Sequence, residues 1–422
     1  MPRLSTMSDL PVTPDDVARA AEVVPRIAVP TALDRSSRLS ERHGVEVLLK
    51  REDQQVGRSY KVRGAFNLMS GLTPDELARG VVCASAGNHA QGLALSCSRL
   101  GVDGHIFVPT NTPRQKRDRI RELGGDRVTL TMLGKTYDEA STAATAHGVE
   151  HQMTYVHPFD DPRTVAGQGT VAFGLVRDEG EPLDVAVVPV GGGGLLAGMA
   201  TWLKHRWPDC RVIGVEPEGA ASMRAALAAG EPVALEGIDT FVDGASVGRV
   251  GATTYPIVRD LVDDVVTVST GAVSTEMLAL YQSDGIIAEP AGAMASAALS
   301  VLELERGSRV GCVVSGGNND VSRYADVIER SLVHEGLRHY FLVSFPQEPG
   351  ALRHFLDDVL AAGEDIVVFE YVKKSNRETG PALIGIDLES ADGLPGLMDR
   401  MKQSNINVEK IASASPLFEF VT

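Results

Sequence analysis

The chain has 422 residues, of which 43% are hydrophobic and 23% are charged, the composition of a soluble globular protein with more than one domain. The net charge of −16 and the lack of a long Lys/Arg run exclude proteins that bind nucleic acid through a basic face. The four cysteines are scattered, which disfavours disulfides and cysteine-ligated metals. We find no signal peptide and no apolar run as long as the roughly 18 residues that a membrane helix needs. These features favour a cytoplasmic protein without a metal or a membrane partner.

Between about residue 45 and residue 325, short apolar runs alternate with longer helix-forming segments. The runs are rich in Val and Ile, as buried parallel strands are, and turn-forming residues follow them. We expect strands at residues 45–49, 80–84, 105–108, 185–190, 211–215 and 309–314, with helices such as 91–100 and 195–206. This pattern predicts an α/β fold with βαβ crossovers, in which ligands bind at the carboxyl ends of strands.

Lys61 follows the first of these strands, in the segment KREDQQVGRSYKVRGAFN. A lysine is usually a solvated surface residue, and an exposed lysine at a helix start is the simpler interpretation. Here Tyr60 and Val62 flank it, and Gly64 and Ala65 follow closely. Semi-apolar surroundings lower the pKa of an amine and favour Schiff-base formation with an aldehyde. Lys61 is therefore a candidate nucleophile, although this pattern alone is weak.

The segment SAGNHAQG, residues 85–92, lies where the second strand ends and a helix begins. Free backbone N–H groups at such a helix start form an anion site, and Asn88 can reach a phenolic or carboxylate oxygen. A simple capped turn with Ser85 as N-cap is the alternative. His89 is expected to be structural, because no second histidine stands at metal-ligand spacing.

The segment PVGGGGLLAG, residues 189–198, places four consecutive glycines between a strand and a helix. Such a run lets the backbone wrap a phosphate with several N–H donors at the positive end of the helix dipole. The same run matches the dinucleotide fingerprint G-x-G-x-x-A, and Glu216 follows at the end of the next strand. A nicotinamide-dependent dehydrogenase is therefore an alternative, although it would give Lys61 and Asn88 no role.

Two further segments combine small residues with a polar one. AEPAGA, residues 288–293, places Glu289 before a helix, either as a helix-start carboxylate or as a residue that faces the site. SGGNND, residues 315–320, closes the last strand, and its Ser315 can donate to a ring nitrogen or accept from it. Taken alone, SGGNND is more simply a loop of turn formers.

The alternation of strands and helices ends near residue 329, and a polar connector is expected at residues 331–339. After it we expect strand 340–345, helix 351–362, strands 365–373 and 382–388, helix 395–404 and strand 407–412. This βαββαβ order is that of the ferredoxin-like fold. The sequence thus predicts three regions, namely a catalytic α/β region at 1–330, a linker at 331–339 and a small domain at 340–422.

Five segments together resemble the motifs of the pyridoxal-phosphate-dependent threonine and serine dehydratases in order and approximate spacing. They are KREDQQVGRSYKVRGAF, SAGNHAQG, GGGGLLAG, AEPAGA and SGGNN. The tail FLVSFPQEPGALRHFL…EDIVVFEYVKKSNRETGPALIGIDL is similar to the ACT-like regulatory domain of biosynthetic threonine dehydratases, in the short form with one such domain. The resemblance implies a two-lobed catalytic region of fold type II, like the tryptophan synthase β-subunit, followed by an amino-acid sensor.

The resemblance also implies roles for individual residues. Lys61 would hold pyridoxal 5′-phosphate and take the Cα proton of L-threonine, Asn88 would bind the cofactor's 3′-oxygen, and Ser315 would contact its ring nitrogen. The cofactor phosphate would be held by Gly191, Gly192, Gly193, Gly194 and Leu195. The substrate carboxylate would be bound by Ser85, Ala86 and Gly87. The products would be 2-oxobutanoate and ammonia, in the first step of isoleucine biosynthesis.

Two alternatives share parts of this resemblance. A serine dehydratase or serine racemase would use the same cofactor-binding residues with a differently shaped pocket, and a non-catalytic amino-acid-binding regulator would not need Lys61. Residues 56–60, Val-Gly-Arg-Ser-Tyr, depart from the Pro-Val-polar-Ser-Phe of many relatives, which leaves the shape of the substrate pocket open. We expect isoleucine to bind the tail and lower activity, and we expect a homodimer or homotetramer.

Overall fold

The computed structural model describes residues 7–371, 378–404 and 406–412. The chain divides into two compact units, Met1–Asp320 and Val321–Thr422. Within the described ranges, none of the helices combines the length and the apolar character that crossing a membrane requires.

The first unit contains two sheets, whose neighbouring strands run parallel except for the edge strand β1. The larger sheet has the order β1-β2-β10-β7-β8-β9 and the smaller one the order β5-β4-β3-β6. The larger sheet is formed by β1 (Leu33–Arg35), β2 (Glu46–Arg51), β7 (Val185–Pro189), β8 (Arg211–Pro217), β9 (Asp264–Val268) and β10 (Arg309–Val314). The smaller sheet is formed by β3 (Val81–Ala84), β4 (Gly104–Val108), β5 (Val128–Met132) and β6 (Thr154–Tyr155).

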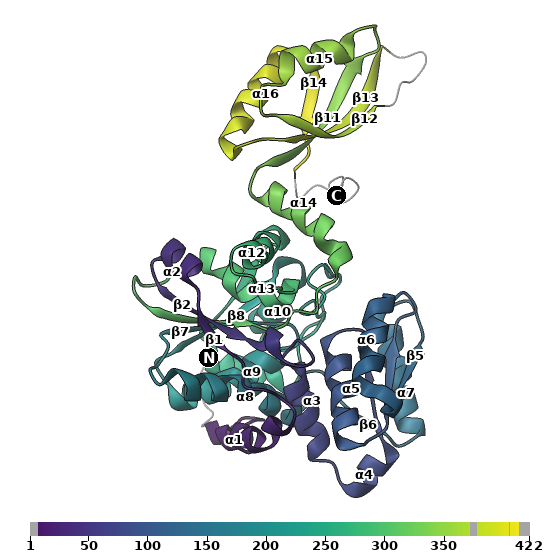
Figure 1. Cartoon of the computed structure of the whole chain (residues 1–422), viewed down its shortest axis with the longest axis vertical. Helices are drawn as coiled ribbons and strands as arrows, with labels where there is room; N and C mark the ends of the chain where they lie inside the picture. Colours follow the sequence, from purple (N-terminus) through teal and green to yellow (C-terminus); the bar gives the residue numbers. More distant parts are fainter. Residues whose placement is uncertain (1–6, 372–377, 405, 413–422) are drawn as a thin grey trace. The chain divides into compact units, whose positions relative to one another are not determined.

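Helices cover both sheets of this unit. They are α1 (Pro14–Val23), α2 (Ser37–His43), α3 (Lys61–Ser70), α4 (Pro74–Arg79), α5 (Asn88–Leu100), α6 (Arg114–Gly124), α7 (Tyr137–Glu150), α8 (Pro162–Glu179), α9 (Gly194–Arg206), α10 (Ser222–Ala229), α11 (Thr254–Leu261), α12 (Thr270–Gln282) and α13 (Pro290–Ala297). In Figure 1, α5, α6 and α7 flank the smaller sheet, while α8 and α9 lie on one face of the larger sheet and α12 and α13 on the other.

The central strands form where the chain is apolar on both faces. All five residues of β7 are buried, and so are five of the six residues of β10. A strand that is covered by helices on both faces needs such a continuous apolar run rather than an alternating one. The residues of α8, α9 and the larger sheet form one core, and those of α3, α5 and the smaller sheet form another.

The predicted α/β fold is confirmed, and each of the six expected strands has a counterpart in β2, β3, β4, β7, β8 and β10. The sequence did not predict β1, β5, β6 or β9, nor the division of the strands into two sheets. Strands β2 and β10 pair although most of the first unit separates them along the chain. Local apolar patterns indicate that a strand is buried but do not indicate its partner.

The second unit begins with α14 (Tyr324–His334) and continues in the predicted βαββαβ order. Its elements are β11 (Arg338–Pro346), α15 (Ala351–Val359), β12 (Asp365–Tyr371), β13 (Thr379–Asp387), α16 (Leu394–Gln403) and β14 (Asn407–Lys410). The sheet is antiparallel with the order β12-β13-β11-β14, which confirms the ferredoxin-like arrangement. Residues 372 and 373 of the predicted strand 365–373 lie outside the described residues.

The core of the second unit lies between its sheet and α15 and α16. Phe345 and Phe355 pack edge to face, with ring centroids 5.2 Å apart. Residues 331–334, the start of the predicted linker, form the last turn of α14. The predicted limits 1–330, 331–339 and 340–422 stay a proposal.

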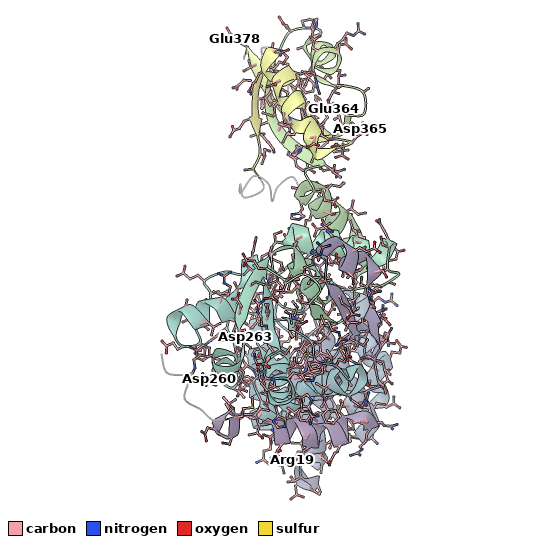
Figure 2. All side chains as sticks on the ribbon, turned by 90° about the vertical axis from the view of Figure 1, so that its left-hand side faces the viewer. Arg19, Asp260, Asp263, Glu364, Asp365 and Glu378 are labelled. Carbon is pink, nitrogen blue, oxygen red and sulfur yellow. The ribbon has the colours of Figure 1, made fainter. Side chains whose placement is uncertain are left out.

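Charged side chains are spread over the surfaces of both units. Figure 2 shows Arg19 and Asp263 on the first unit and Asp365 and Glu378 on the second, and each of these four residues is exposed. The acidic surplus of the sequence is therefore not confined to one unit.

Candidate active site

Four of the predicted site segments follow parallel strands at their carboxyl ends. Ser85 follows β3, the glycine run follows β7 and Ser315 follows β10. Lys61 lies at the end of the loop after β2, as the first residue of α3. The carboxyl ends of parallel strands are where α/β proteins bind ligands, so the fold gathers these segments at one place.

The loop before Lys61 pairs with the loop after β10. Ser59 and Gly316 form an isolated antiparallel bridge, and the Tyr60 N–H donates to the Ser315 carbonyl at 3.2 Å. This pairing fixes the start of α3 beside Ser315. Arg58, in the same loop, has a φ of 52°, a left-handed conformation that non-glycine residues rarely adopt. Backbone strain of this kind concentrates at functional sites.

Lys61 is mostly buried, and its Nζ donates to the Pro158 carbonyl at 3.1 Å. Burial lowers the pKa of Lys61 to about 8, although the nearby carboxylate of Glu289 acts in the opposite direction. The ammonium also lies 5.4 Å from the centre of the Tyr60 ring. An amine with this pKa is partly unprotonated near neutral pH, which is the state that attacks an aldehyde or takes up a proton.

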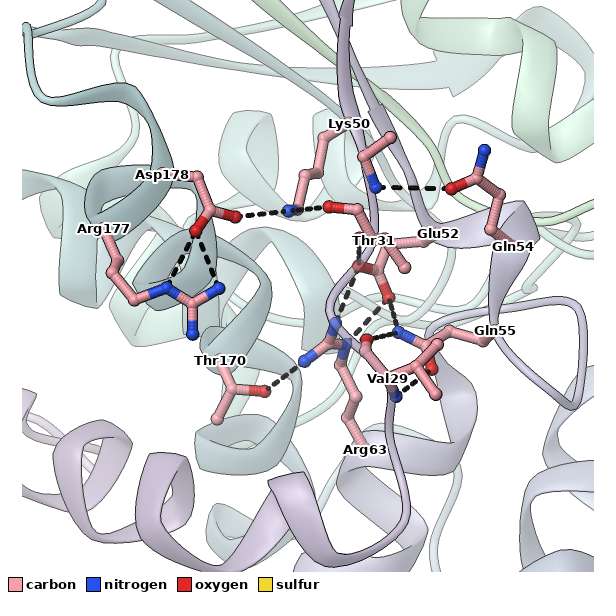
Figure 3. Close-up of polar contacts among 11 residues, drawn as sticks. Val29, Thr31, Lys50, Glu52, Gln54, Gln55, Arg63, Thr170, Arg177 and Asp178 are labelled. Atoms are coloured by element: carbon pink, nitrogen blue, oxygen red, sulfur yellow. Dashed lines mark hydrogen bonds and ion pairs between the residues drawn. The ribbon is translucent and has the colours of Figure 1, made fainter.

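A buried ionic cluster ties α3 to neighbouring segments through Arg63, two residues after Lys61 (Figure 3). The guanidinium of Arg63 donates twice to the carboxylate of Glu52, at 2.8 Å each, and once to the Thr170 hydroxyl at 3.2 Å. Glu52 also accepts from the Thr31 hydroxyl at 2.7 Å. Glu52 is fully buried and Arg63 is 7% exposed, so each charge depends on the other for compensation.

Asn88 and Glu289 connect the smaller-sheet lobe to the larger-sheet lobe. The Asn88 Nδ2 donates to Glu289 Oε1 at 2.6 Å, and Asn88 Oδ1 accepts from Asn318 Nδ2 at 2.6 Å. Burial and the charge of Asp243 raise the pKa of Glu289 to about 7, while the hydrogen bond from Asn88 lowers it. Of the two interpretations of Glu289 from the sequence, the structure supports the residue that faces the site.

The glycine run after β7 leads directly into α9, whose N-terminus has no side-chain cap. Gly193 has a φ of 92°, which glycine adopts without strain. A Cβ atom on Gly192 would lie 2.3 Å from the ring of Phe159, so only glycine fits there. The unpaired amides of the first helical turn, together with the helix dipole, favour an anion at this end of α9.

The loop 157–161 connects Lys61 with the glycine run. Pro158 accepts from Lys61, and Phe159 covers Gly192. Asp160 accepts from the backbone N–H groups of Ala252 and Thr253, at 3.0 and 2.7 Å. The lysine and the predicted phosphate loop therefore lie on either side of one short segment.

The segment 85–87 lies at the start of α5, which also lacks a side-chain cap. The Ser85 hydroxyl accepts from the Gly87 N–H at 3.2 Å, which makes a tight turn before the helix. Ser85 does not cap α5, so the helix start is open to a ligand anion such as a carboxylate.

Ser315 and His89 are buried beside these groups. The Ser315 hydroxyl donates to the Ala291 carbonyl at 3.2 Å, which leaves its lone pairs available. His89 Nε2 lies 2.7 Å from the Val156 carbonyl, and burial together with the charge of Lys61 lowers the pKa of His89 to about 3. A neutral histidine bound to a backbone carbonyl is consistent with the structural role expected for it.

Glu216, which suggested a dinucleotide site, has a different role in the structure. Its buried carboxylate accepts from the N–H groups of Met223 and Arg224, at 2.7 and 2.9 Å, at the start of α10. The carboxylate is thus used to cap a helix.

The site residues match the functional groups of pyridoxal 5′-phosphate. A partly unprotonated amine suits an aldehyde, an uncapped helix start suits a phosphate, and an amide and a hydroxyl suit the ring oxygen and nitrogen. Sequence analysis missed Pro158, Phe159, Asn318 and the Glu52–Arg63 pair. Asn318 lies within the quoted segment SGGNND, and Glu52 and Arg63 lie within the quoted segment around Lys61, but no spacing marked them. Pro158 and Phe159 lie in none of the quoted segments.

Two family models match the chain. Residues 25–316 match a model described as pyridoxal-phosphate dependent enzyme, and residues 329–421 match one described as the C-terminal regulatory domain of threonine dehydratase. The biosynthetic L-threonine dehydratase IlvA of Mycobacterium tuberculosis is 55% identical over 408 residues, which cover 96% of this chain and 95% of that protein.

Solved structures agree with these matches. The processed form of threonine deaminase isoform 2 from Solanum lycopersicum has a TM-score of 0.71 and 40% identity, over 75% of this chain and 93% of that one. Maize serine racemase has a TM-score of 0.70 and 30% identity, over 76% of this chain and 98% of that one.

Proposed function

The chain belongs to the pyridoxal-phosphate-dependent threonine dehydratases, and from this premise we propose the roles of its site residues and of its second unit. It is a biosynthetic L-threonine dehydratase, a lyase of the isoleucine pathway with a C-terminal regulatory domain. The observation that carries the proposed catalytic role of Lys61 is its mostly buried amine, with a pKa lowered to about 8, beside the loop 157–161 that also packs on the glycine run.

When bound, the cofactor withdraws electrons from Cα of the attached amino acid. Lys61 would hold the cofactor, and its Nζ, once free, would take up the Cα proton of the substrate. A base works best with a pKa near the working pH, and the pKa of Lys61 meets that condition. The β-hydroxyl would leave with a proton as water, and the released enamine would then take up water and give 2-oxobutanoate and ammonia.

The remaining residues position the reacting groups. Ser85, Ala86 and Gly87, at the uncapped start of α5, bind the substrate carboxylate. Gly191–Gly194 and Leu195 hold the cofactor phosphate with backbone N–H groups at the start of α9. Asn88 donates to the ring oxygen. Ser315 would contact the ring nitrogen as a neutral hydroxyl, and it can donate to an unprotonated nitrogen if its hydrogen turns away from the Ala291 carbonyl.

The reaction is tested by incubating the loaded protein with L-threonine or L-serine and assaying 2-oxo acid and ammonia. We expect 2-oxobutanoate and ammonia in equal amounts from threonine. Oxo acid from serine but not from threonine would indicate a serine dehydratase. Racemised serine without ammonia would indicate a serine racemase. The full chain should be used, so that the same protein also serves for the test of regulation.

We propose that isoleucine binds a cavity of about 400 Å³ in the second unit and lowers activity. Its lining includes the apolar residues Phe345, Leu352, Leu356, Phe369 and Tyr371 and the charged residues Glu348 and Arg353. An amino acid with an apolar side chain needs an apolar wall, an anion for its ammonium group and a cation for its carboxylate. This cavity offers all three.

The effector site is tested by measuring isoleucine binding to the full chain by calorimetry, together with inhibition. Leu356→Gln places a polar group in the lining and should weaken binding and inhibition together, whereas Asp357→Asn on the same helix should change neither. Unchanged inhibition in Leu356→Gln would mean that isoleucine does not bind in this cavity. Unchanged inhibition after deletion of residues 340–422 would mean that the second unit has no part in the inhibition.

We also propose that the enzyme is a cytoplasmic homodimer or homotetramer. Apart from the cavity lining, the second unit exposes Val321, Ile328 and Val367, at 79%, 45% and 37%, and a second copy would cover such apolar side chains. The four cysteines are all free and buried, which suits a reducing compartment. Sedimentation of the full chain should give two or four times the 44.8 kDa mass, and cell fractionation should recover the enzyme with cytoplasmic markers.

A further inference from the structure

The orientation of the Asn88 amide is determined by a chain of hydrogen bonds that begins at a backbone carbonyl. The Gly57 carbonyl can only accept, so the group of Asn318 that lies 2.9 Å from it must be Nδ2. The same Nδ2 lies 2.6 Å from Asn88, so the Asn88 atom that faces it must be the acceptor Oδ1. Both hydrogens of Asn318 Nδ2 are then used.

The other end of the Asn88 amide is equally determined. With Oδ1 turned toward Asn318, Nδ2 faces Glu289 Oε1 at 2.6 Å and donates one hydrogen to it. A flipped amide would set Nδ2 against the Nδ2 of Asn318 and Oδ1 against the Glu289 carboxylate. Two favourable contacts would become two repulsive ones, so the flipped orientation is excluded.

Glu289 and Asn318 are themselves held in place. Glu289 is 5% exposed, and its backbone N–H donates to the Gly316 carbonyl at 3.1 Å. A Cβ atom on Gly316 would lie 2.2 Å from Glu289 Oε1, so the carboxylate fills space that the glycine leaves. Asn318 is held by the loop that precedes Lys61 through its bond to Gly57.

We propose that Glu289 and Asn318 are positioning residues that hold the Asn88 amide in one orientation, with its second N–H free to donate to the ring oxygen of the cofactor. The inference rests on the cofactor-binding role proposed for Asn88. It gives Asn318 a role that neither the family match nor the sequence assigned. It also explains why Asn88, in the smaller-sheet lobe, is bonded to two residues of the other lobe.

A double-mutant cycle tests this inference. Cofactor is removed, and the dissociation constant of pyridoxal 5′-phosphate is measured by absorbance for the wild type, Asn88→Ala, Asn318→Ala and the double variant. Loss of one hydrogen bond to the cofactor weakens binding by about tenfold, since about 1.4 kcal/mol corresponds to a factor of ten. We expect Asn318→Ala to weaken binding in the wild type but to add little in the Asn88→Ala background.

Further variants separate positioning from folding. Glu289→Gln keeps an acceptor oxygen for Asn88 and should bind cofactor more tightly than Glu289→Ala. Asn67→Ala is the matched control, because Asn67 also donates to a backbone carbonyl, that of Arg163 at 2.7 Å, but lies outside the site. Its cofactor affinity should equal that of the wild type. If Asn318→Ala does not fold, Asn318→Asp keeps the volume and replaces the donor with an acceptor, and should weaken binding in the same cycle.

Equal weakening by the Asn318 variant in both backgrounds would overturn the inference, since Asn318 would then act independently of Asn88. An unchanged affinity in Asn88→Ala would also overturn it, because Asn88 would have no bond to the cofactor. Neither result would change the dehydratase function, which the product assay and the Lys61 variants test separately.

Discussion

Two lysines, Lys50 in β2 and Lys61 at the start of α3, are both withdrawn from water, but their surroundings differ. Lys50, at 1% exposure, donates to the Thr31 carbonyl at 2.9 Å and pairs with Asp178 at 3.4 Å, next to the Glu52–Arg63 pair. Lys61 donates to the Pro158 carbonyl and, among the residues that the structure describes, forms no ion pair. A lysine with a carboxylate partner stabilises the fold, whereas a lysine without one keeps its amine available for chemistry.

The largest expected effect is on activity, when Lys61 and Lys50 are each replaced separately by an uncharged residue. Lys61→Ala should lower the rate of threonine dehydration by about 10²- to 10⁴-fold, because it removes the base as well as the attachment point of the cofactor. Lys50→Met should keep most of the activity per folded molecule. Rates of 2-oxobutanoate formation, divided by the folded fraction from circular dichroism, provide the comparison. Comparable losses in the two variants would show that the lysines do not differ as described.

The Glu52–Arg63 pair should matter mainly for stability. Glu52→Ala leaves the buried Arg63 without its partner and should lower the free energy of unfolding by about 3–5 kcal/mol. Asp103→Asn, which breaks the exposed pair with Arg127, should cost no more than about 1 kcal/mol. Urea denaturation of the three proteins measures both values. A cost below about 1 kcal/mol for Glu52→Ala would mean that Arg63 finds another partner.

The smallest effect is a shift in the pH dependence of cofactor capture. Only the unprotonated amine attacks the aldehyde, so the rate of capture by the apoprotein should rise with pH through about 8 and then level off. The negative charge of Glu289 raises the pKa of Lys61, so Glu289→Gln should move the midpoint to lower pH. Stopped-flow absorbance measures the rate. A midpoint near the ordinary lysine value of 10.5 would contradict the desolvation of Lys61.

Short motifs in the sequence brought the candidate residues to notice, and their roles stay a prediction. Asn88 and the glycine run closely follow β3 and β7, and Lys61 closes the loop after β2. The same patterns could not show that Pro158 would lie against Lys61 or that Asn318 would reach Asn88, because these contacts join distant segments. The Glu52–Arg63 pair was missed for another reason, since its residues are usually exposed and nothing local signals that they are buried.

The second unit was predicted more completely than the first. It is a small unit in which only β12 and β13 pair as neighbours along the chain, but its βαββαβ order has one common sheet arrangement and so indicates the sheet. In the first unit, β2 and β10 pair across most of the chain, and no local pattern encodes that pairing. The strand order of a sheet is therefore least predictable where pairing is least local.

The most direct test of the account is to find which lysine carries the cofactor. The loaded protein is treated with borohydride, which makes the lysine–cofactor linkage permanent, and the modified peptide is identified by mass spectrometry after digestion. We expect the cofactor on Lys61 and no modification of Lys50. Modification of Lys50 or of any other lysine, with Lys61 unmodified, would contradict it.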